Sequence, residues 1–169
     1  MDTTLSIRPA DLDDINIIGF LAQQIWPKTY GDTLSPEQLQ YMLNLFYSPA
    51  SLRRQMLEDR HQFLILEEAE EPIGFASWSV TQEPGVYKLH KLYVLPGQQG
   101  KGLGTMILQF IFDDIRPEGA VMLRLNVNRY NKARQFYEKM GFAVVKEEDV
   151  AIGNNYFMND YVMEIPISG

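Results

Sequence analysis

The sequence predicts a single domain of the mixed α/β class, and three observations lead to this prediction. The chain has 169 residues, and a domain of that length buries roughly 70% of its unfolded surface in one core. Stretches with apolar residues at helical spacing alternate with short apolar runs of strand length. No internal repeat, low-complexity segment or Pro/Gly/Ser-rich linker interrupts this alternation. Residues 1–169 are therefore expected to form one domain.

Each expected element has a local signal. Serine caps a helix and proline fits its first turn, so Ser35-Pro36 and Ser48-Pro49 predict the starts of two helices. Glycine often follows the last residue of a helix, so Gly141 predicts the end of the last one. The expected elements are, in order, a strand from Leu5 to Pro9, a helix begun by Asp11 with its apolar stripe over 15–25, a helix from Ser35 to about Phe46, a helix from Ser48, strands over 63–66, 73–80 and 86–95, a helix over 102–115, a strand over 122–127, a helix over 131–140, and strands over 144–150 and 157–165.

The composition excludes several classes of protein. Apolar residues make up 46% of the chain and charged residues 22%, as in ordinary soluble domains, and no apolar run approaches the roughly 20 residues that span a membrane. With no cysteine and two histidines, disulfides, thiolate metal sites and histidine-rich metal sites are excluded. The N-terminus lacks the features of a signal peptide, which favours a cytoplasmic location. A net charge of −7 disfavours nucleic acid as a partner and suits a cationic one.

A glycine-rich loop over residues 96–105 (PGQQGKGLGT) lies between a predicted strand and a predicted helix. Backbone N–H groups at a helix N-terminus bind anions, and glycines let a phosphate approach closely. A P-loop needs serine or threonine after Gly-Lys, but Gly102 follows Lys101; the spacing also differs from the dinucleotide pattern G-x-G-x-x-G. The loop is thus expected to bind phosphate in another way, with a plain turn as the alternative.

Two motifs resemble the GNAT superfamily of N-acetyltransferases. Residues 99–104 (QGKGLG) match the Q/R-x-x-G-x-G/A pyrophosphate loop of that family. Residues 125–142 (LNVNRYNKARQFYEKMGF) are similar to its later strand–helix segment, with signature positions at Asn131, Ala133, Tyr137 and Gly141-Phe142. The motifs come in the right order, and the resemblance extends over essentially the whole chain. It implies a central mixed, mostly antiparallel sheet that is flanked by helices and splayed at the cofactor strand.

The resemblance also implies direct transfer of an acetyl group from acetyl-CoA to a primary amine, without a metal. Backbone groups of Leu92, Tyr93 and Val94 would bond the pantetheine arm, and Asn131 would bond the cofactor from a helix. Tyr137 would be the general acid for the departing thiolate, with packing beside Phe136 as the alternative. The pyrophosphate would lie against the amides of Gln99, Gly100, Lys101, Gly102, Leu103, Gly104 and Thr105.

The general base departs from the family pattern. Family members often carry a glutamate on the strand that corresponds to residues 86–94, facing the active site. Here the same-face positions hold Lys88 and His90. Imidazole ordinarily titrates near pH 6.5, so His90 is the expected base. A water-mediated route from a more distant acid stays open as an alternative.

The acceptor is expected to be a small amine such as a polyamine. Residues 26–31 (WPKTYG) and the aromatic residues that follow loosely resemble the N-terminal segment of bacterial polyamine acetyltransferases. Trp26 and Tyr30 are the expected substrate contacts, with helix packing as the alternative. The acidic residues that would suit a polycation are Asp32, Glu37 and Asp160. Acetylation of proteins or peptides, a non-catalytic acetyl-CoA-binding regulator and a homodimer all stay open.

Overall fold

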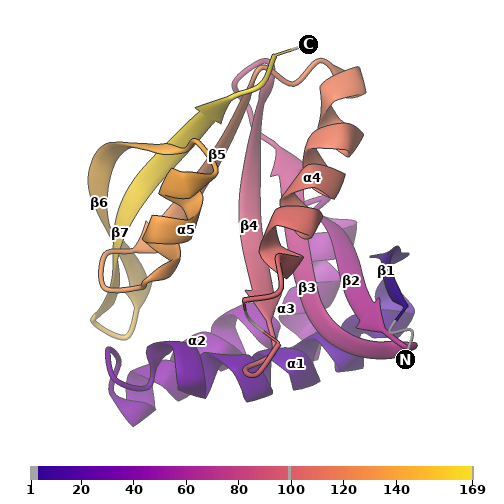
Figure 1. Cartoon of the computed structure of the whole chain (residues 1–169). Coiled ribbons are helices and arrows are strands. Elements are labelled where there is room, and N and C mark those ends of the chain that lie inside the picture. Colours follow the sequence, from indigo (N-terminus) through magenta and orange to yellow (C-terminus); the bar gives the residue numbers. More distant parts are fainter. Residues whose placement is uncertain (1–3, 99, 169) are drawn as a thin grey trace. The chain divides into compact units, whose positions relative to one another are not determined.

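The structure, a computed structural model, describes residues 4–98 and 100–168. These residues form five α-helices, two short 3-10 helices and seven strands (Figure 1). Within this part of the chain, no helix has the length and apolar character needed to cross a membrane. The elements in chain order are β1 (Leu5–Ala10), η1 (Leu12–Asp14), α1 (Ile15–Tyr30), α2 (Pro36–Tyr47), α3 (Pro49–Leu57), β2 (Gln62–Glu68), β3 (Glu71–Val80), β4 (Val86–Val94), α4 (Leu103–Ile115), η2 (Arg116–Glu118), β5 (Met122–Asn128), α5 (Ala133–Lys139), β6 (Ala143–Gly153) and β7 (Tyr156–Pro166).

The strands follow the order β1-β2-β3-β4-β5-β7-β6 in one sheet. Strand β4 pairs with β5 in parallel, and the described pairs β1–β2, β2–β3, β5–β7 and β6–β7 are antiparallel. The predicted mixed, mostly antiparallel sheet is therefore confirmed. The chain forms two compact units, one of Met1–Ser79 with Lys91–Gln109 and one of Val80–His90 with Phe110–Gly169, so each half of β4 belongs to a different unit.

The first unit holds β1, β2, β3 and the bundle of α1, α2 and α3. The Ser35 side chain accepts a hydrogen bond from Gln38 N at 3.1 Å, and the Ser48 side chain accepts one from Ser51 N at 3.2 Å. Both predicted helix starts are confirmed. The predicted apolar stripe of α1 is buried, and its fully or nearly fully buried members are Ile18, Leu21, Ala22 and Ile25.

Helix α1 begins later than the predicted cap at Asp11 and continues beyond the end of its apolar stripe. Asp11 caps the short helix η1 rather than α1, since its side chain accepts from Asp13 N at 2.9 Å. At the other end, α1 runs through Pro27 to Tyr30. The backbone N–H of Gly31 donates to Pro27 O at 3.0 Å, and those of Thr33 and Leu34 both donate to Tyr30 O at 2.9 Å.

Strand β1 continues through Pro9 to Ala10, although proline was expected to end it. Strand β1 lies at the edge of the sheet, and an edge strand has no neighbour on its open side. On that side, the backbone N–H that proline lacks is not needed for a hydrogen bond between strands. Arg8 ties this strand to the turn that follows it. Its guanidinium donates to Asp14 at 2.9 and 3.0 Å and to Glu67 at 3.2 Å, and this pairing lowers the pKa of the Asp14 carboxyl.

The second unit holds the first half of β4 together with β5, β6, β7 and α5. Along β5, the buried residues Leu123, Leu125 and Val127 alternate with the half-buried polar residues of the other face. Helix α5 contacts β5 (Figure 1). It starts at Ala133, two residues later than expected, because Asn131 Oδ1 accepts from Ala133 N at 2.9 Å and forms a turn first.

Candidate active site

The glycine loop of the first unit has a backbone suited to an anion. Gly97, Gly100 and Gly102 have φ of 90°, 84° and 73°, in the left-handed region that favours glycine. A Cβ at any of the three would meet no heavy atom within 4 Å, so the space beside each is open. Helix α4 follows at once, and Met106 N donates to Gly102 O at 3.1 Å. The N–H groups of a first helical turn have no partner within the helix, so this turn can hold phosphate oxygens.

The predicted pyrophosphate contacts lie together in this loop and turn. Gly100, Lys101 and Gly102 are exposed, Leu103 is buried, Gly104 is half-buried and Thr105 is exposed. The Lys101 ammonium donates to Gln98 Oε1 at 2.8 Å, which holds the loop from within. Gln99, also predicted as a contact, lies outside the described residues.

The second half of β4, which leads into the loop, carries the predicted pantetheine contacts. Side chains alternate between the two faces of a strand, so Leu92 and Val94 share one face and Lys91 and Tyr93 share the other. Leu92 and Tyr93 are half-buried and Val94 is buried. The structure thus places Tyr93 on the face that it shares with the aromatic residues of α1.

The predicted substrate residues meet the predicted cofactor strand inside the first unit. The hydroxyls of Tyr30 and Tyr93 lie 2.9 Å apart. The centre of the Trp26 ring lies 4.7 Å from the ring centre of Tyr30 and 6.0 Å from that of Tyr93. We call these three residues the aromatic wall. Because Trp26 and Tyr30 are both buried, they also pack the helix, as the alternative interpretation expected.

Two other residues extend the aromatic wall. Tyr47, the last residue of α2, has its ring 5.5 Å from that of Trp26. Phe75 on β3 has its ring 5.8 Å from that of Tyr47 and 5.7 Å from that of Tyr93. Burial raises the pKa of Tyr47 well above the ordinary value of a tyrosine, so its hydroxyl stays protonated.

Lys91 was missed by the sequence reasoning, although it is the most unusual charged residue of the first unit. It is 8% exposed, and its Nζ lies 5.2 Å from the ring centre of Tyr47 and 5.9 Å from that of Phe63. Desolvation lowers its pKa to about 8. Lys91 shares one face of the predicted strand with Leu89 and Tyr93, and a charge on this apolar face was the available signal.

Tyr137, the predicted general acid, lies in the second unit on α5. It is buried, with its ring 5.3 Å from that of Phe136 and 5.5 Å from that of Phe142. Both ring contacts are edge-to-face, an arrangement that fixes the direction of the ring. Asn131, in the same unit, is half-buried, and its side-chain oxygen Oδ1 accepts the hydrogen bond from Ala133 N in the turn before α5.

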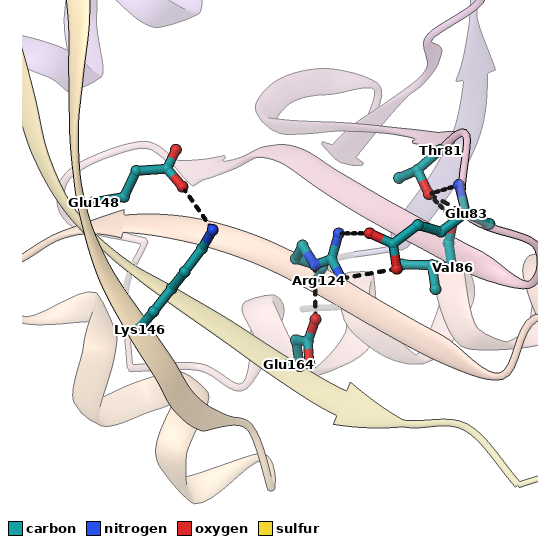
Figure 2. A network of polar contacts seen from close by, with 7 residues as sticks. All are labelled: Thr81, Glu83, Val86, Arg124, Lys146, Glu148 and Glu164. Atoms are coloured by element: carbon teal, nitrogen blue, oxygen red, sulfur yellow. Dashed lines mark hydrogen bonds and ion pairs between the residues drawn. The ribbon is translucent and has the colours of Figure 1, made fainter.

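His90 and Lys88 lie on the same face of β4 in the second unit, and both are half-buried. A network centred on Arg124 holds this part of β4 (Figure 2). The Arg124 guanidinium donates to Glu164 on β7 at 2.7 Å and to Glu83 before β4 at 2.9 and 3.3 Å. The network therefore fixes the start of the strand on which His90 is carried.

The three acids proposed for a cationic substrate differ in burial. Asp32 and Glu37 are exposed, whereas Asp160 on β7 is 4% exposed. Asn126 Nδ2 donates to Asp160 Oδ2 at 3.2 Å, but burial is the larger effect and raises the pKa of this carboxyl. Asp160 is thus a buried acid with an increased affinity for a proton.

Comparisons with known proteins identify the family. Residues 30–159 match the acetyltransferase (GNAT) domain. An uncharacterized N-acetyltransferase of Mycobacterium tuberculosis is 26% identical over 153 residues, which are 90% of this chain and 97% of that protein. The spermidine N(1)-acetyltransferase of Thermoplasma acidophilum is 25% identical over 146 residues, 83% of this chain and 89% of that protein.

The solved structures agree with this match. The crystal structure of the PaiA N-acetyltransferase from Thermoplasma acidophilum in complex with coenzyme A is similar with a TM-score of 0.82 and 24% identity, over 96% of this chain and 99% of that one. The resemblance predicted from the loop and the strand–helix motif is therefore confirmed. The chain belongs to the GNAT family of acetyl-CoA-dependent N-acetyltransferases.

Proposed function

We propose that the chain acetylates the primary amine of a small molecule. The observation that carries this proposal is the hydroxyl contact at 2.9 Å between Tyr30 and Tyr93. It joins α1, where we expect the acceptor to bind, to the strand on which we expect the pantetheine arm to lie. Sites for small molecules are lined mainly by apolar and aromatic side chains with a few polar groups, and the aromatic wall with its two hydroxyls has this composition.

The proposed reaction is direct acetyl transfer. The ammonium form of the amine first gives a proton to a base, because it has no lone pair with which to attack. The neutral amine then attacks the thioester carbonyl of acetyl-CoA, the new C–N bond forms, and the C–S bond breaks. Coenzyme A leaves as a thiolate, which takes the hydroxyl proton of Tyr137, and the second proton that the attacking nitrogen loses restores the Tyr137 hydroxyl.

We assign acetyl-CoA to the loop and the strand before it. Backbone groups of Leu92, Tyr93 and Val94 bond the pantetheine arm, and Asn131 remains a further expected contact of the cofactor. The open space beside Gly100 and Gly102 supports a bound anion there. Among the described residues, the proposed pyrophosphate contacts are the amides of Gly100, Lys101, Gly102, Leu103, Gly104 and Thr105.

Two groups compete for the role of base. His90 is the first, since it lies on the face of β4 where family members often carry a glutamate. Asp160 is the second, as the more distant acid that acts through water. The raised pKa of its buried carboxyl makes it a better proton acceptor than an ordinary aspartate.

Polyamines are one class of acceptor to test, because a relative is named a spermidine N(1)-acetyltransferase and the net charge of this chain is −7. The test is a thiol-release assay with acetyl-CoA and a panel of polyamines, amino acids, aminosugars and peptides. Turnover of a small amine supports the proposal. Turnover of peptides alone would move the function to protein acetylation.

Binding of acetyl-CoA is tested separately by thermal unfolding. At 100 times its dissociation constant, a ligand of the native state adds about 2.7 kcal/mol of stability. Gly102→Glu should abolish this protection, because it places bulk and negative charge where we expect phosphate. Gly119→Glu is the matched control: Gly119 has φ of 89° and no heavy atom near its Cβ position, so it shares the backbone strain but should keep the protection. Equal protection of both variants would show that the loop does not bind the cofactor.

A further inference from the structure

Lys91 is a buried cation for which the described residues supply no counter-ion. Its ammonium lies over the rings of Tyr47 and Phe63, 5.2 and 5.9 Å from their centres. Aromatic faces attract an ammonium group, but they carry no net negative charge and accept no ion pair. Burial of an unpaired charge is costly, so proteins rarely keep such a residue without a partner. A small anion would supply the counter-ion that the described residues do not provide.

Ser77 provides a second, independent observation on the same face of the sheet. Its hydroxyl is fully buried and has no hydrogen-bond partner among the described residues. Ser77 pairs with Phe63 in the register of β2 and β3, and residues paired in this way point to the same face. Ser77 therefore lies beside the ring that Lys91 contacts. Buried hydroxyls are nearly always hydrogen-bonded in native proteins.

Lys91 lies next to the aromatic wall. Tyr93 lies two residues later on the same face of β4, and the Tyr47 ring under the Lys91 ammonium is in contact with Trp26. An acceptor that binds against Trp26 and Tyr30 would therefore lie against the same group of side chains that holds the Lys91 ammonium. All of these residues belong to the first unit.

We propose that Lys91 and Ser77 bind a carboxylate of the acceptor, so that the substrate is a small primary amine that also carries a carboxylate, such as an amino acid. This inference rests on the proposed function, which it narrows. An ammonium and a hydroxyl are both donors, and a carboxylate offers two acceptor oxygens. A polyamine carries no anion, and its ammonium groups are repelled by Lys91.

The test compares acceptors that differ by one carboxylate. The pairs are lysine and cadaverine, ornithine and putrescine, and γ-aminobutyrate and propylamine, with spermidine as a further acceptor. For the wild type we expect kcat/KM to favour the acid of a productive pair by at least about tenfold, which equals about 1.4 kcal/mol. A wild type that acetylates the decarboxylated amines or spermidine as well as the acids would overturn the inference, whatever the variants do.

Variants show whether Lys91 is responsible. In Lys91→Met the preference for the acid should fall to within about threefold, mainly through a higher KM for the acid, while Lys91→Arg should retain it. Lys139→Met is the matched control, because it removes the same charge from an exposed position on α5. A preference unchanged in Lys91→Met contradicts the assignment. If Lys91→Met does not fold, loss of the preference in Lys91→Gln decides instead, and the comparison within the wild type still applies.

The two levels of the proposal fail differently. If no small amine is acetylated, the proposed function is wrong and this inference falls with it. If small amines are acetylated without regard to their carboxylates, the function stands and the inference is wrong.

Discussion

Replacement of Lys91 by methionine should stabilise the folded protein at neutral pH. Burial lowers the pKa of Lys91 from 10.5 to about 8. Because the unfolded chain binds this proton more tightly, the proton binding destabilises the folded state, and this penalty is complete at every pH below about 8. At 1.36 kcal/mol per pKa unit, the penalty is about 3 kcal/mol. Methionine keeps much of the apolar stem and removes the charge, although any change in packing adds a constant to the difference.

The pH dependence separates charge from packing. The wild type recovers the penalty as the pH rises from about 8 toward 10.5, whereas Lys91→Met has none to recover. The difference in unfolding free energy between variant and wild type should therefore shrink by about 2.5 kcal/mol between pH 7 and pH 10. Urea unfolding at several pH values measures it, because a packing effect stays constant. Lys139→Met is the control, because it removes the same charge from an exposed position. A difference that does not change with pH would refute the argument that Lys91 is an uncompensated charge.

Three further predictions concern the catalytic residues and the first unit. Tyr137→Phe keeps the ring contacts and removes one hydroxyl, so single-turnover acetyl transfer should fall at least about tenfold with acetyl-CoA affinity unchanged; an unchanged rate would assign Tyr137 to packing. His90→Ala should remove the acidic limb of the pH–rate profile if His90 is the base, and Asp160→Asn should remove it if Asp160 is the base. A limb that survives in both variants would mean that water accepts the proton of the amine. Asp14→Asn should cost about 1–3 kcal/mol at pH 7, because Arg8 stabilises the Asp14 carboxylate and lowers its pKa. The wild type loses this stabilisation as the pH falls from the ordinary pKa of an aspartate, about 3.9, through the lowered pKa in the folded state. Acid unfolding experiments should therefore show the stabilities of the two chains converging.

Local signals predicted most of the elements correctly. The Ser-Pro pairs gave the starts of α2 and α3, because a cap and a first-turn proline act within one turn of the chain. The errors lie where a distant part of the structure overrides a local rule. Pro9 was expected to end β1, but the strand continues because an edge strand does not need its N–H. The place of a strand at the edge of the sheet cannot be read from the residues next to the proline.

Only those parts of the candidate site that are contiguous in the chain could be proposed from the sequence. The glycine-rich loop is contiguous, so its spacing alone was enough to single it out as a candidate. The contact of Tyr30 with Tyr93 joins residues 63 positions apart, and the partners of Lys91 come from α2 and β2. Burial of a charged residue depends on such distant neighbours, which is why the sequence pointed to His90 and passed over the lysine beside it.

Pro27 in the last turn of α1 has a consequence for the entropy of recognition. The ring of proline fixes φ at this position and reduces the number of conformations open to the turn that carries Tyr30. The carbonyls of Pro27 and Tyr30 are also occupied by backbone donors. Tyr30, the proposed acceptor contact, is therefore held on a stiff support, so the proposal implies that little order has to be imposed on it when an acceptor binds.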